Sequence, residues 1–433
     1  VLLAEFRDRV APHQLNAWHP RTLSYFTPPP LVLSIVGELL AQFTQQGVDV
    51  WHAGPSAAFV EEEVVRWLCD LVGYGPGSFG LLTSGGVMAN FMALALARDV
   101  QLRRIRGLDR PPRGAALEDA RVYVSDQGHF SVARALDELG FPPQTLVTLP
   151  SDDGFRLRVE ALADAVAADL AAGLTPFAVV AVSGTTNTGS IDDVPAIAAV
   201  AAHHGLWLHV DAAYGGAALL SQGLAPLVDG LELADSVTVD PHKWFFQAYD
   251  IGGLMVRDGR LLEQTFSRRP EYYRGGGETA REHDAHDSDS LDFYRLGFEG
   301  TRRWRALKLW MSWKHLGTRG LGRLVEANVA IAQYLSQLIE ASADFEQSPS
   351  NPELSVVCFR HVPAGPRPDP EALDAHQDAL QAAMEASGDG WLSTTRLRGS
   401  TWLRAGVMNH MTTEADIDRL LEGLRRLARQ APS

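Results

Sequence analysis

The chain has 433 residues, of which 46% are hydrophobic, and its 38 basic and 53 acidic side chains give a formal net charge of −15. This is the composition of a folded globular protein, and it excludes a disordered, collagen-like or disulfide-stapled chain. The acidic balance argues against a nucleic-acid partner, because a phosphate backbone needs a basic binding surface. The length allows two or three domains.

The two cysteines, Cys69 and Cys358, lie far apart and outside any CxxC motif. This spacing indicates neither a disulfide framework nor a thiolate zinc site, and it favours a reducing compartment. The longest apolar runs, such as residues 177–182, are far shorter than the roughly 20 residues that a bilayer requires, and the first residues lack a signal-peptide pattern. We therefore expect a cytoplasmic protein without a membrane partner.

Apolar runs of strand length alternate with amphipathic runs of helical length through the first part of the chain. The predicted strand and helix pairs are 81–84 with 87–108, 122–125 with 131–139, 145–149 with 158–171, and 177–183 with 194–203, followed by strands 206–210 and 236–239. This alternation predicts an α/β fold whose parallel sheet carries helices on both faces. Ligands of such sheets bind at the C-terminal ends of the strands.

The later part of the chain has a different texture. Residues 268–300 are polar and glycine-rich, so we expect a long surface loop there. A helix at 302–316 follows, and the rest predicts a smaller α+β unit. Its elements are helix 321–341, strand 355–360, helix 371–386, strand 401–405 and helix 413–429. The predicted domains are an N-terminal segment (1–50), a large domain (51–315) and a small C-terminal domain (316–433).

Two features at predicted strand ends concern charge. The motif TSGGVMAN (residues 83–90) follows a strand and opens a helix, where glycines let the backbone approach a ligand and the helix N-terminus favours a phosphate. A strand-to-helix turn also needs glycine for structural reasons alone. Asp211 stands directly beyond another apolar strand, where a carboxylate loses solvation unless a cation or donors compensate it. Its ordinary alternative is a helix cap or a surface carboxylate.

Two further strand ends carry reactive side chains. Lys243, within DPHKW (240–244), follows the strand at 236–239. A lysine in apolar surroundings favours its neutral amine, which attacks an aldehyde to form a Schiff base. His129, within SDQGHFS (125–131), follows another strand, where an imidazole stacks on a flat ring or moves a proton. Taken singly, each residue is more often an ordinary solvated or structural group.

Together, a phosphate-binding turn, a strand-end carboxylate, a lysine and a flat imidazole are what pyridoxal 5′-phosphate (PLP) requires. The lysine carries this cofactor covalently, and the aspartate keeps the pyridine nitrogen protonated so that the ring accepts electrons. The combination therefore predicts a PLP site.

The sequence resembles the PLP-dependent group II amino-acid decarboxylases, the family of aromatic-L-amino-acid, histidine, tyrosine and glutamate decarboxylases. The resemblance covers nearly the whole chain, and its most specific part is HVDAAYGG followed by DPHKW. The motifs found in family order are LTSGGVMANFMALALAR, VSDQGHFSVARAL, VSGTTNTGSIDDV, LHVDAAYGG, DSVTVDPHKW and TRRWRALKLW. The resemblance implies a fold type I, aspartate-aminotransferase-like enzyme that forms an obligate homodimer, with both subunits lining each site and the N-terminal segment contributing to the pocket and the dimer contacts.

The resemblance also implies residue roles. Lys243 would form the Schiff base, Asp211 would pair with the pyridine nitrogen, and Ala213 and His129 would lie on opposite ring faces. The residues around the phosphate and the substrate carboxylate would be Ser84, Gly85, Gly86, Val87, Thr186, Asp240 and His242. The aromatic residues of the substrate pocket would be Trp18, Tyr25, Phe26, Phe293 and, from the other subunit, Trp51. Plain core packing is an equal alternative for these aromatics.

The implied reaction is decarboxylation of an L-amino acid to the amine and carbon dioxide, through a lysine aldimine and a quinonoid intermediate. In the family a loop tyrosine is thought to protonate Cα. Ungapped alignment back from the TRRWR motif puts Phe293 at that place, beside Tyr294. If Tyr294 does not reach Cα, protonation falls to His129 or water, or oxygen converts the quinonoid to an aldehyde. A second departure is Asp240, where several relatives carry Asn, because its charge near a phosphate must be offset.

The pocket favours an aromatic or large apolar amino acid, because glutamate would need a cationic partner for its side chain. Glutamate, valine-type and histidine substrates stay open. The alternative functions are an aromatic aldehyde synthase, which decarboxylates and oxidatively deaminates, another fold type I lyase or aminotransferase, and a catalytically silent PLP-binding protein.

His283 and His286 are interpreted as part of a solvated charge run and not as a metal site. We interpret Arg302, Arg303 and Arg305 as tying a helix start to the domain interface.

Overall fold

The computed structural model describes residues 2–268 and 291–430. Contacts divide this part of the chain into two compact units. The larger unit comprises Pro30–Glu326 and Pro352–Leu354, and the smaller one comprises the residues up to Pro29, Ala327–Asn351 and the residues from Ser355 onward. The predicted domain boundaries at residues 50 and 315 stay a prediction. Most of the predicted surface loop, with His283 and His286, lies outside the described residues.

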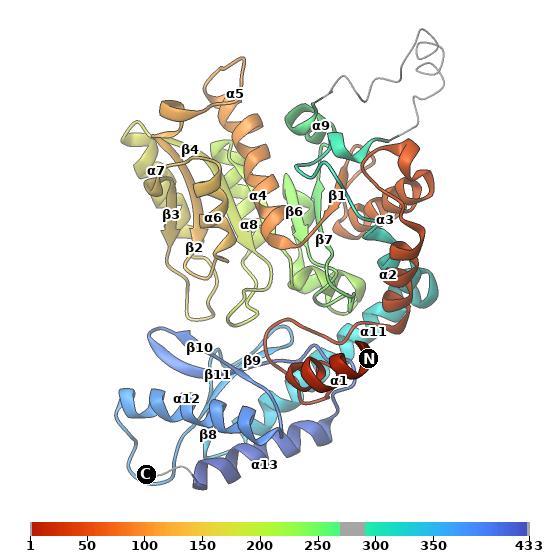
Figure 1. The fold of residues 1–433 in the computed structure, drawn as a ribbon. Helices are drawn as coiled ribbons and strands as arrows, with labels where there is room; N and C mark the ends of the chain where they lie inside the picture. The colour runs from red at the N-terminus through yellow and green to blue at the C-terminus, as the bar shows by residue number, and fades with distance from the viewer. Residues whose placement is uncertain (1, 269–290, 431–433) are drawn as a thin grey trace. The chain divides into compact units, whose positions relative to one another are not determined.

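The larger unit contains a seven-stranded sheet in the order β1-β7-β6-β5-β4-β2-β3 (Figure 1). Its strands are β1 (Phe79–Thr83), β2 (Ala120–Ser125), β3 (Leu146–Leu149), β4 (Thr175–Val182), β5 (Trp207–Asp211), β6 (Ser236–Val239) and β7 (Gly252–Val256). All of them run in the same direction except β7, which pairs antiparallel with both β1 and β6. The predicted α/β fold with a mainly parallel sheet is therefore confirmed.

The sequence pattern missed β7. This strand begins with Gly252 and Gly253, and glycine is depleted in strands because it has no side chain to pack and loses much backbone entropy. A glycine is nevertheless required at its start, since a Cβ on Gly252 would lie 2.5 Å from Cα of Gly85. The backbones of Gly85, in the turn after β1, and of Gly252 are therefore in direct contact.

Helices cover both faces of this sheet (Figure 1). The helices of the larger unit up to residue 266 are α2 (Val32–Thr44), α3 (Pro55–Val72), α4 (Gly86–Leu96), α5 (Arg103–Ile105), α6 (Ser131–Glu138), α7 (Val159–Ala171), α8 (Val194–His204) and α9 (Arg260–Phe266). The predicted helix at 87–108 is in fact α4 and α5 joined by a π-helical segment, Ala97–Leu102. Helix α4 packs against β5, β6 and β7, and helices α7 and α8 pack against β4.

The core of the larger unit follows the two-residue period of its strands. Val122 and Val124 of β2 join the cluster formed with helices α4 and α6, together with Val180 of β4. Tyr123 and Val179, one residue along, point to the opposite face and are also fully buried. Burying each such side chain contributes about 1.5–3 kcal/mol, so both faces fix the strands that end at the candidate site.

The smaller unit contains a four-stranded antiparallel sheet in the order β10-β11-β9-β8. Its strands are β8 (Phe345–Gln347), β9 (Val356–His361), β10 (Ser393–Leu397) and β11 (Ser400–Gly406), and its helices are α1 (Leu2–Arg9), α12 (Pro370–Ser387) and α13 (Glu414–Gln430). Leu380 of α12 and Leu420 of α13 belong to one buried cluster with Leu403 of β11. The predicted smaller α+β unit is confirmed.

Helix α11 (Ala306–Glu340) runs from the larger unit into the smaller one. Gly317 interrupts it with φ 65° and ψ 170°, which are not helical, so α11 consists of two helices that meet at a kink and correspond to the two predicted helices, 302–316 and 321–341. The first half begins later than predicted, since residues 302–305 are not helical. Within the described ranges, none of the helices combines the length and apolar character that crossing a bilayer requires.

Candidate active site

The C-terminal ends of the parallel strands lie at one edge of the sheet in the larger unit. The turns after β1, β2, β4 and β6 carry residues 84–87, His129, Thr186 and Lys243, in this order, and β5 ends at Asp211. Because these strands are parallel neighbours or are joined through β7, their ends face the same side of the unit. The fold therefore brings the predicted cofactor-binding residues to a single edge.

Asp211 is a buried carboxylate held by two hydrogen-bond donors, and it is 6% exposed. Its Oδ2 accepts a hydrogen bond from the amide of Asn90 at 2.7 Å, and its Oδ1 accepts one from the backbone N–H of Ala213 at 3.1 Å. None of the described lysine, arginine or histidine side chains forms an ion pair with it. A buried charge without a cationic neighbour is costly, so this carboxylate suits a ligand that carries a positive N–H group.

Behind Asp211 lies a set of buried polar side chains that we call the Asn90 network: Asn90, Ser131, His209, Asp211 and Thr238. The Asn90 amide donates to the Ser131 hydroxyl at 2.9 Å as well as to Asp211. Its oxygen accepts from the Thr238 hydroxyl at 2.8 Å and faces Nε2 of His209 at 3.0 Å. Burial lowers the pKa of His209 to about 4 against the opposing effect of Asp211, so the His209 ring is neutral at physiological pH.

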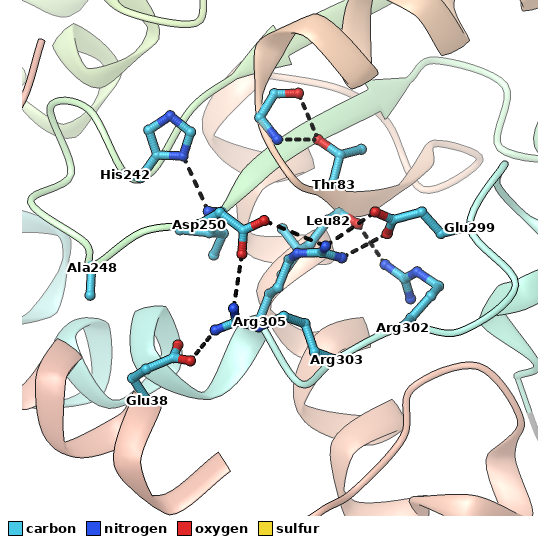
Figure 2. Close-up of polar contacts among 12 residues, drawn as sticks. Glu38, Leu82, Thr83, His242, Ala248, Asp250, Glu299, Arg302, Arg303 and Arg305 are labelled. Atoms are coloured by element: carbon cyan, nitrogen blue, oxygen red, sulfur yellow. Dashed lines mark hydrogen bonds and ion pairs between the residues drawn. The ribbon is translucent and has the colours of Figure 1, made fainter. Parts of the chain in front are cut away.

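Lys243 lies in the turn after β6, with its side chain 21% exposed. Its Nζ is 3.2 Å from Oδ2 of Asp240, which is 2% exposed, and Nε2 of His242 is 3.7 Å from the same oxygen. Nδ1 of His242 accepts the backbone N–H of Ile251 at 3.1 Å, which leaves the proton of the neutral ring on Nε2 (Figure 2). Burial favours that neutral ring by lowering the pKa of His242. Asp240 therefore has the Lys243 amine and a neutral imidazole beside it, and its place near a phosphate stays a prediction.

The lysine content of the chain makes Lys243 distinctive. The sequence contains three lysines: Lys243, Lys308 and Lys314. Lys308 is fully buried and pairs with Glu38 at 2.6 Å, and Lys314 is an exposed partner of Glu63. Of the three, Lys243 alone follows a strand at the C-terminal edge, so only its amine is placed to bond a cofactor bound there.

Helix α4 begins at Gly86, directly after β1. Gly85 has φ 147°, a conformation that other residues rarely adopt, and a Cβ there would lie 3.1 Å from Cε1 of His242. A Cβ on Gly86 would lie 2.9 Å from Oδ2 of Asp240. The Thr83 hydroxyl bonds the backbone of Gly85 and steadies this turn (Figure 2). The first N–H groups of a helix have no partner within it, so the cradle suits an anion.

His129 is half-buried in the turn between β2 and α6. Its Nδ1 lies 2.8 Å from the Ser131 hydroxyl, and the backbone N–H of Ser131 donates to the same nitrogen at 3.3 Å. Burial lowers the pKa of His129, although the charge of Asp211 acts in the opposite direction. A neutral imidazole, whose orientation Ser131 fixes, suits stacking against a flat ring.

Ala213 and Thr186 differ in their surroundings. Ala213 is 7% exposed and lies against Gly86, because a Cβ on that glycine would come within 3.3 Å of the alanine methyl group. A small side chain there leaves room for a ring. Thr186 is exposed in the loop after β4, next to Asn187, whose amide bonds Gln127 at 3.3 Å. That bond ties this loop to the turn that carries His129.

These features fit PLP on three independent counts. The glycine turn at α4 is a cradle that side chains would fill, and it presents helix N–H groups to a phosphate. The buried carboxylate of Asp211 has no cation beside it and matches a protonated pyridine nitrogen. The turn after β6 supplies a primary amine. The residues at the strand ends are therefore compatible with the cofactor that the sequence predicts.

The predicted substrate-pocket aromatics are divided between the two units. In the smaller unit, the Tyr25 ring lies 5.3 Å from that of Trp391, the Phe26 ring lies 4.6 Å from the Arg404 guanidinium, and Trp18 is 41% exposed. In the larger unit, the Trp51 ring lies 6.3 Å from that of Phe59. That these aromatics line one pocket stays a prediction.

Phe293 belongs to the short helical turn Phe293–Arg295 of the larger unit. It is fully buried, with its ring 6.1 Å from that of Phe79 and 5.1 Å from the guanidinium carbon of Arg302. These are the surroundings of a core residue, and its contact with a substrate stays a prediction. Tyr294 is half-buried and donates its backbone N–H to Asp49 at 3.1 Å. Its catalytic role likewise stays a prediction.

A second set of charged side chains, mostly buried or half-buried, lies beneath the glycine turn, and we call it the Arg302 cluster (Figure 2). It consists of Glu38, Glu61, Asp250, Glu299, Arg302, Arg303, Arg305 and Lys308. Arg302 and Glu61 are both fully buried and pair with each other, and they bond the backbone oxygen and N–H of Leu82 at 2.6 and 3.2 Å. This pair therefore secures the end of β1.

The remainder of the Arg302 cluster holds the segment before β7. Arg303 lies 3.2 Å from Asp250, Arg305 lies 3.6 Å from it, and Lys308 bonds the backbone oxygens of Ala248 and Asp250 at 3.0 and 3.2 Å. These contacts fix the chain just before the N–H group that His242 accepts. All described partners of these cations belong to the larger unit, so the arginines support β1 and the segment before β7, and their predicted place at the domain interface stays a prediction.

Sequence reasoning did not single out Asn90, Ser131, His209 or Thr238, although all four lie inside the motifs quoted above. A usable signal existed for Asn90, because a polar amide in the otherwise apolar sequence GVMANFMALAL is expected to have buried partners. Those partners come from α6, β5 and β6 and are far away in sequence, so the sequence alone does not identify them.

Comparison with known proteins agrees with this site. The family model described as the pyridoxal-dependent decarboxylase conserved domain matches residues 2–362. The chain is 31% identical to an aromatic-L-amino-acid decarboxylase from Bacillus atrophaeus, over 95% of this chain and 82% of that one. It is 30% identical to an L-2,4-diaminobutyrate decarboxylase from Acinetobacter baumannii, over 94% and 79% of the two chains.

Two further similarities concern a different activity and a bound cofactor. The chain is 29% identical to a phenylacetaldehyde synthase from Arabidopsis thaliana, over 96% of this chain and 83% of that one. Its fold matches the crystal structure of Oryza sativa TDC with PLP and tryptamine with a TM-score of 0.91, at 28% identity over 99% and 87% of the two chains. The chain belongs to the pyridoxal-dependent decarboxylases and is a PLP-dependent carboxy-lyase of that family.

Proposed function

We propose that this enzyme decarboxylates an aromatic or large apolar L-amino acid to the corresponding amine and carbon dioxide. The observation that carries the proposal is that a strand-end lysine, Lys243, and a buried carboxylate, Asp211, lie at the same edge of the sheet, and that Asp211 has no cation beside it among the described residues. When bound, PLP supplies a protonated pyridine ring that takes up the electron pair of the broken bond between Cα and the carboxylate.

The chain's own residues would divide the remaining work. Lys243 would hold the cofactor through its amine and release it when the substrate amine takes its place. Asp211 would hold the proton of the ring nitrogen, and Gly86 and Val87 would bind the phosphate through their N–H groups. His129 would cover one ring face opposite the small Ala213. Proton delivery to Cα is proposed for Tyr294, with His129 or water as the alternative.

The substrate class rests on the predicted aromatic pocket of Trp18, Tyr25, Phe26, Trp51 and Phe293. Relatives of similar identity act on substrates as different as aromatic amino acids and 2,4-diaminobutyrate, so the pocket decides the proposal. The test is incubation of the PLP-loaded protein with the twenty common amino acids, DOPA and 2,4-diaminobutyrate, followed by mass spectrometry of amine, aldehyde and carbon dioxide. Turnover of an aromatic or large apolar substrate supports the proposal, and turnover of charged substrates alone overturns it.

A second candidate is an aromatic aldehyde synthase, which oxidises the same substrate with oxygen to aldehyde, ammonia, carbon dioxide and hydrogen peroxide. Two observations favour it: Phe293 stands where the family's loop tyrosine is expected, and one relative is a phenylacetaldehyde synthase. Measuring ammonia and peroxide beside the amine separates the two candidates. Peroxide formed in equal amounts with carbon dioxide would favour the synthase.

We also propose a cytoplasmic homodimer with shared active sites. Helix α2 supports it with an outward apolar face, on which Val32, Leu39 and Phe43 are 66%, 68% and 84% exposed. Such a face is stable when a second copy covers it. Mixing a Lys243→Ala protein with a Trp51→Ala protein should restore part of the activity if Trp51 enters the partner's site. A monomer in analytical ultracentrifugation would overturn the proposal.

A further inference from the structure

The side-chain amide of Asn90 uses all of its hydrogen-bonding capacity inside the larger unit. It is 1% exposed, and its nitrogen donates to Asp211 at 2.7 Å and to Ser131 at 2.9 Å. Its oxygen accepts from Thr238 at 2.8 Å and faces Nε2 of His209 at 3.0 Å. An amide has two donor hydrogens and two acceptor positions, so no hydrogen bond is left to make.

Asp211 decides which way this amide points. An ionised carboxylate only accepts hydrogen bonds, so the NH₂ end of Asn90 must face it and the oxygen must face His209 and Thr238. The reversed amide would set its oxygen 2.7 Å from a carboxylate oxygen, with no hydrogen between them. The direction of every bond around Asn90 therefore follows from the charge on Asp211.

The same amide determines the role of Ser131. Because Asn90 donates to the Ser131 oxygen, the serine hydroxyl hydrogen is left to point elsewhere. Nδ1 of His129 lies 2.8 Å from that oxygen and also accepts the backbone N–H of Ser131 at 3.3 Å. Two donors directed at Nδ1 require that nitrogen to be without a proton, so the neutral His129 ring carries its proton on Nε2.

We propose that Asn90 is a positioning residue that couples the two groups in contact with the cofactor ring, Asp211 directly and His129 through Ser131. The inference rests on the proposed roles of Asp211 and His129. One amide then holds the Asp211 carboxylate in place for the pyridine nitrogen. Through Ser131 it also keeps the proton of the neutral His129 ring on Nε2, so that His129 donates from this atom.

The experiment combines histidine ¹⁵N NMR of the apoprotein with PLP titration of three variants, using the full chain. The His129 signals are assigned by their loss in a His129→Gln protein. In the wild type we expect a protonated Nε2 and a bare Nδ1. Ser131→Ala should shift the ring toward the other tautomer or a mixture, and it should weaken PLP binding less than Asn90→Ala does, because the bond between Asn90 and Asp211 stays in place.

Asn90→Ala should change both readouts, with the same tautomer shift and PLP binding weakened about tenfold or more, as expected when a hydrogen bond to a charged group is lost. The matched control is Gln377→Ala, in α12 of the smaller unit. That amide is also fully buried and bonds the backbone of His361 and Leu373 at 2.9 and 3.1 Å. The Gln377→Ala protein should be less stable than the wild type, but its His129 tautomer and its PLP affinity should be unchanged.

A protonated Nδ1 of His129 in the wild-type apoprotein would overturn the inference. A folded Asn90→Ala protein with the wild-type tautomer and PLP affinity would overturn it as well. Should Asn90→Ala fail to fold, the wild-type spectrum and Ser131→Ala decide in the same way. Borohydride trapping of PLP on Lys243 tests the proposed function separately. If no PLP is trapped on Lys243, the proposed function is refuted. If PLP is trapped and the variants keep the wild-type His129 tautomer and PLP affinity, only the role of Asn90 is refuted.

Discussion

The Asn90 network and the Arg302 cluster are two polar groups in the interior of the same unit, and they differ in charge balance. The Arg302 cluster pairs each cation with an anion, as between Arg302 and Glu61. Even Glu38, whose burial acts to raise its pKa, has a lowered pKa because Lys308 bonds it. The Asn90 network holds one carboxylate, Asp211, and one histidine, His209, which is neutral because burial lowers its pKa to about 4. Among the described residues, the negative charge of Asp211 therefore has no opposite charge beside it.

This difference distinguishes a structural role from a functional one. A set of ion pairs in which each cation has an anionic partner balances its own charge and supports β1 and the segment before β7. An uncompensated carboxylate costs stability in the empty protein and gains it back when a cationic ligand binds. Charge balance within a buried group is thus a better guide to a ligand site than the number of charges in it.

The largest expected effect comes from removing the amine of Lys243. Lys243→Ala should abolish borohydride-stable attachment of PLP and lower kcat by about 10³-fold or more, because the covalent anchor is lost. Peptide mass spectrometry after reduction measures the attachment. Lys314→Ala, which removes an exposed lysine, is the matched control and should keep both label and activity. A label on Lys308 or Lys314 in the wild type would contradict the assignment.

Neutralising the carboxylate tests the uncompensated charge itself. Asp211→Asn keeps the shape of the side chain, but it cannot hold a proton on the ring nitrogen. We expect kcat to fall about 10²–10³-fold, as when a preorganised electrostatic group is removed, together with weaker PLP binding in an equilibrium titration. In the apoprotein the removal of a buried charge is opposed by the loss of one hydrogen bond, because the NH₂ end of the new amide cannot accept from Asn90 or from the backbone N–H of Ala213. Wild-type kcat in this variant would show that the charge is dispensable.

Breaking an ion pair of the Arg302 cluster should lower the stability of the protein and leave PLP attachment intact. Arg302→Met leaves Glu61 charged and buried, so the free energy of unfolding in urea should drop by about 3–5 kcal/mol. PLP attachment to Lys243 should persist in the folded protein. Adding Glu61→Leu should recover part of the loss, because the unpaired charge is removed. If the folded single variant failed to bind PLP, the cluster would have a direct role in the site.

The smallest effect concerns acid stability. The pKa of His209 is about 4 in the folded protein and about 6.5 when unfolded, so below pH 6.5 the unfolded state binds more protons. Stability should therefore fall as the pH drops from 6.5 toward 4, and the share of His209 is about 2 kcal/mol between pH 7 and pH 5. Urea titrations at both pH values should show a smaller loss for His209→Gln than for the wild type. An equal loss would exclude His209 as the source.

The sequence predicted the large features of this comparison and missed the contacts within it. Alternating strands and helices predict the parallel sheet, and residues such as Lys243 and Asp211 are recognisable because each directly follows an apolar strand. The fold class and the family are confirmed. The roles assigned to single residues stay predictions.

What the sequence missed depends on pairing between distant segments. Thr238 lies 148 residues from Asn90, and Arg302 lies 241 residues from Glu61, so no local pattern links them. The strand β7 was missed because it begins with two glycines, which are depleted in strands, although close packing against Gly85 requires the first of them, Gly252. In each case the missing information was three-dimensional proximity.

The place of β7 in the sheet bears on how the enzyme is made. In the part of the chain that the structure describes, β1 pairs with β7 alone, and β7 is translated after the segment that contains Lys243. A nascent chain that ends before residue 252 therefore lacks the strand that joins β1 to β6, although helix α3 already contacts β1. Forming the pair closes a long loop, so we expect both halves of the cofactor site to come together late in synthesis.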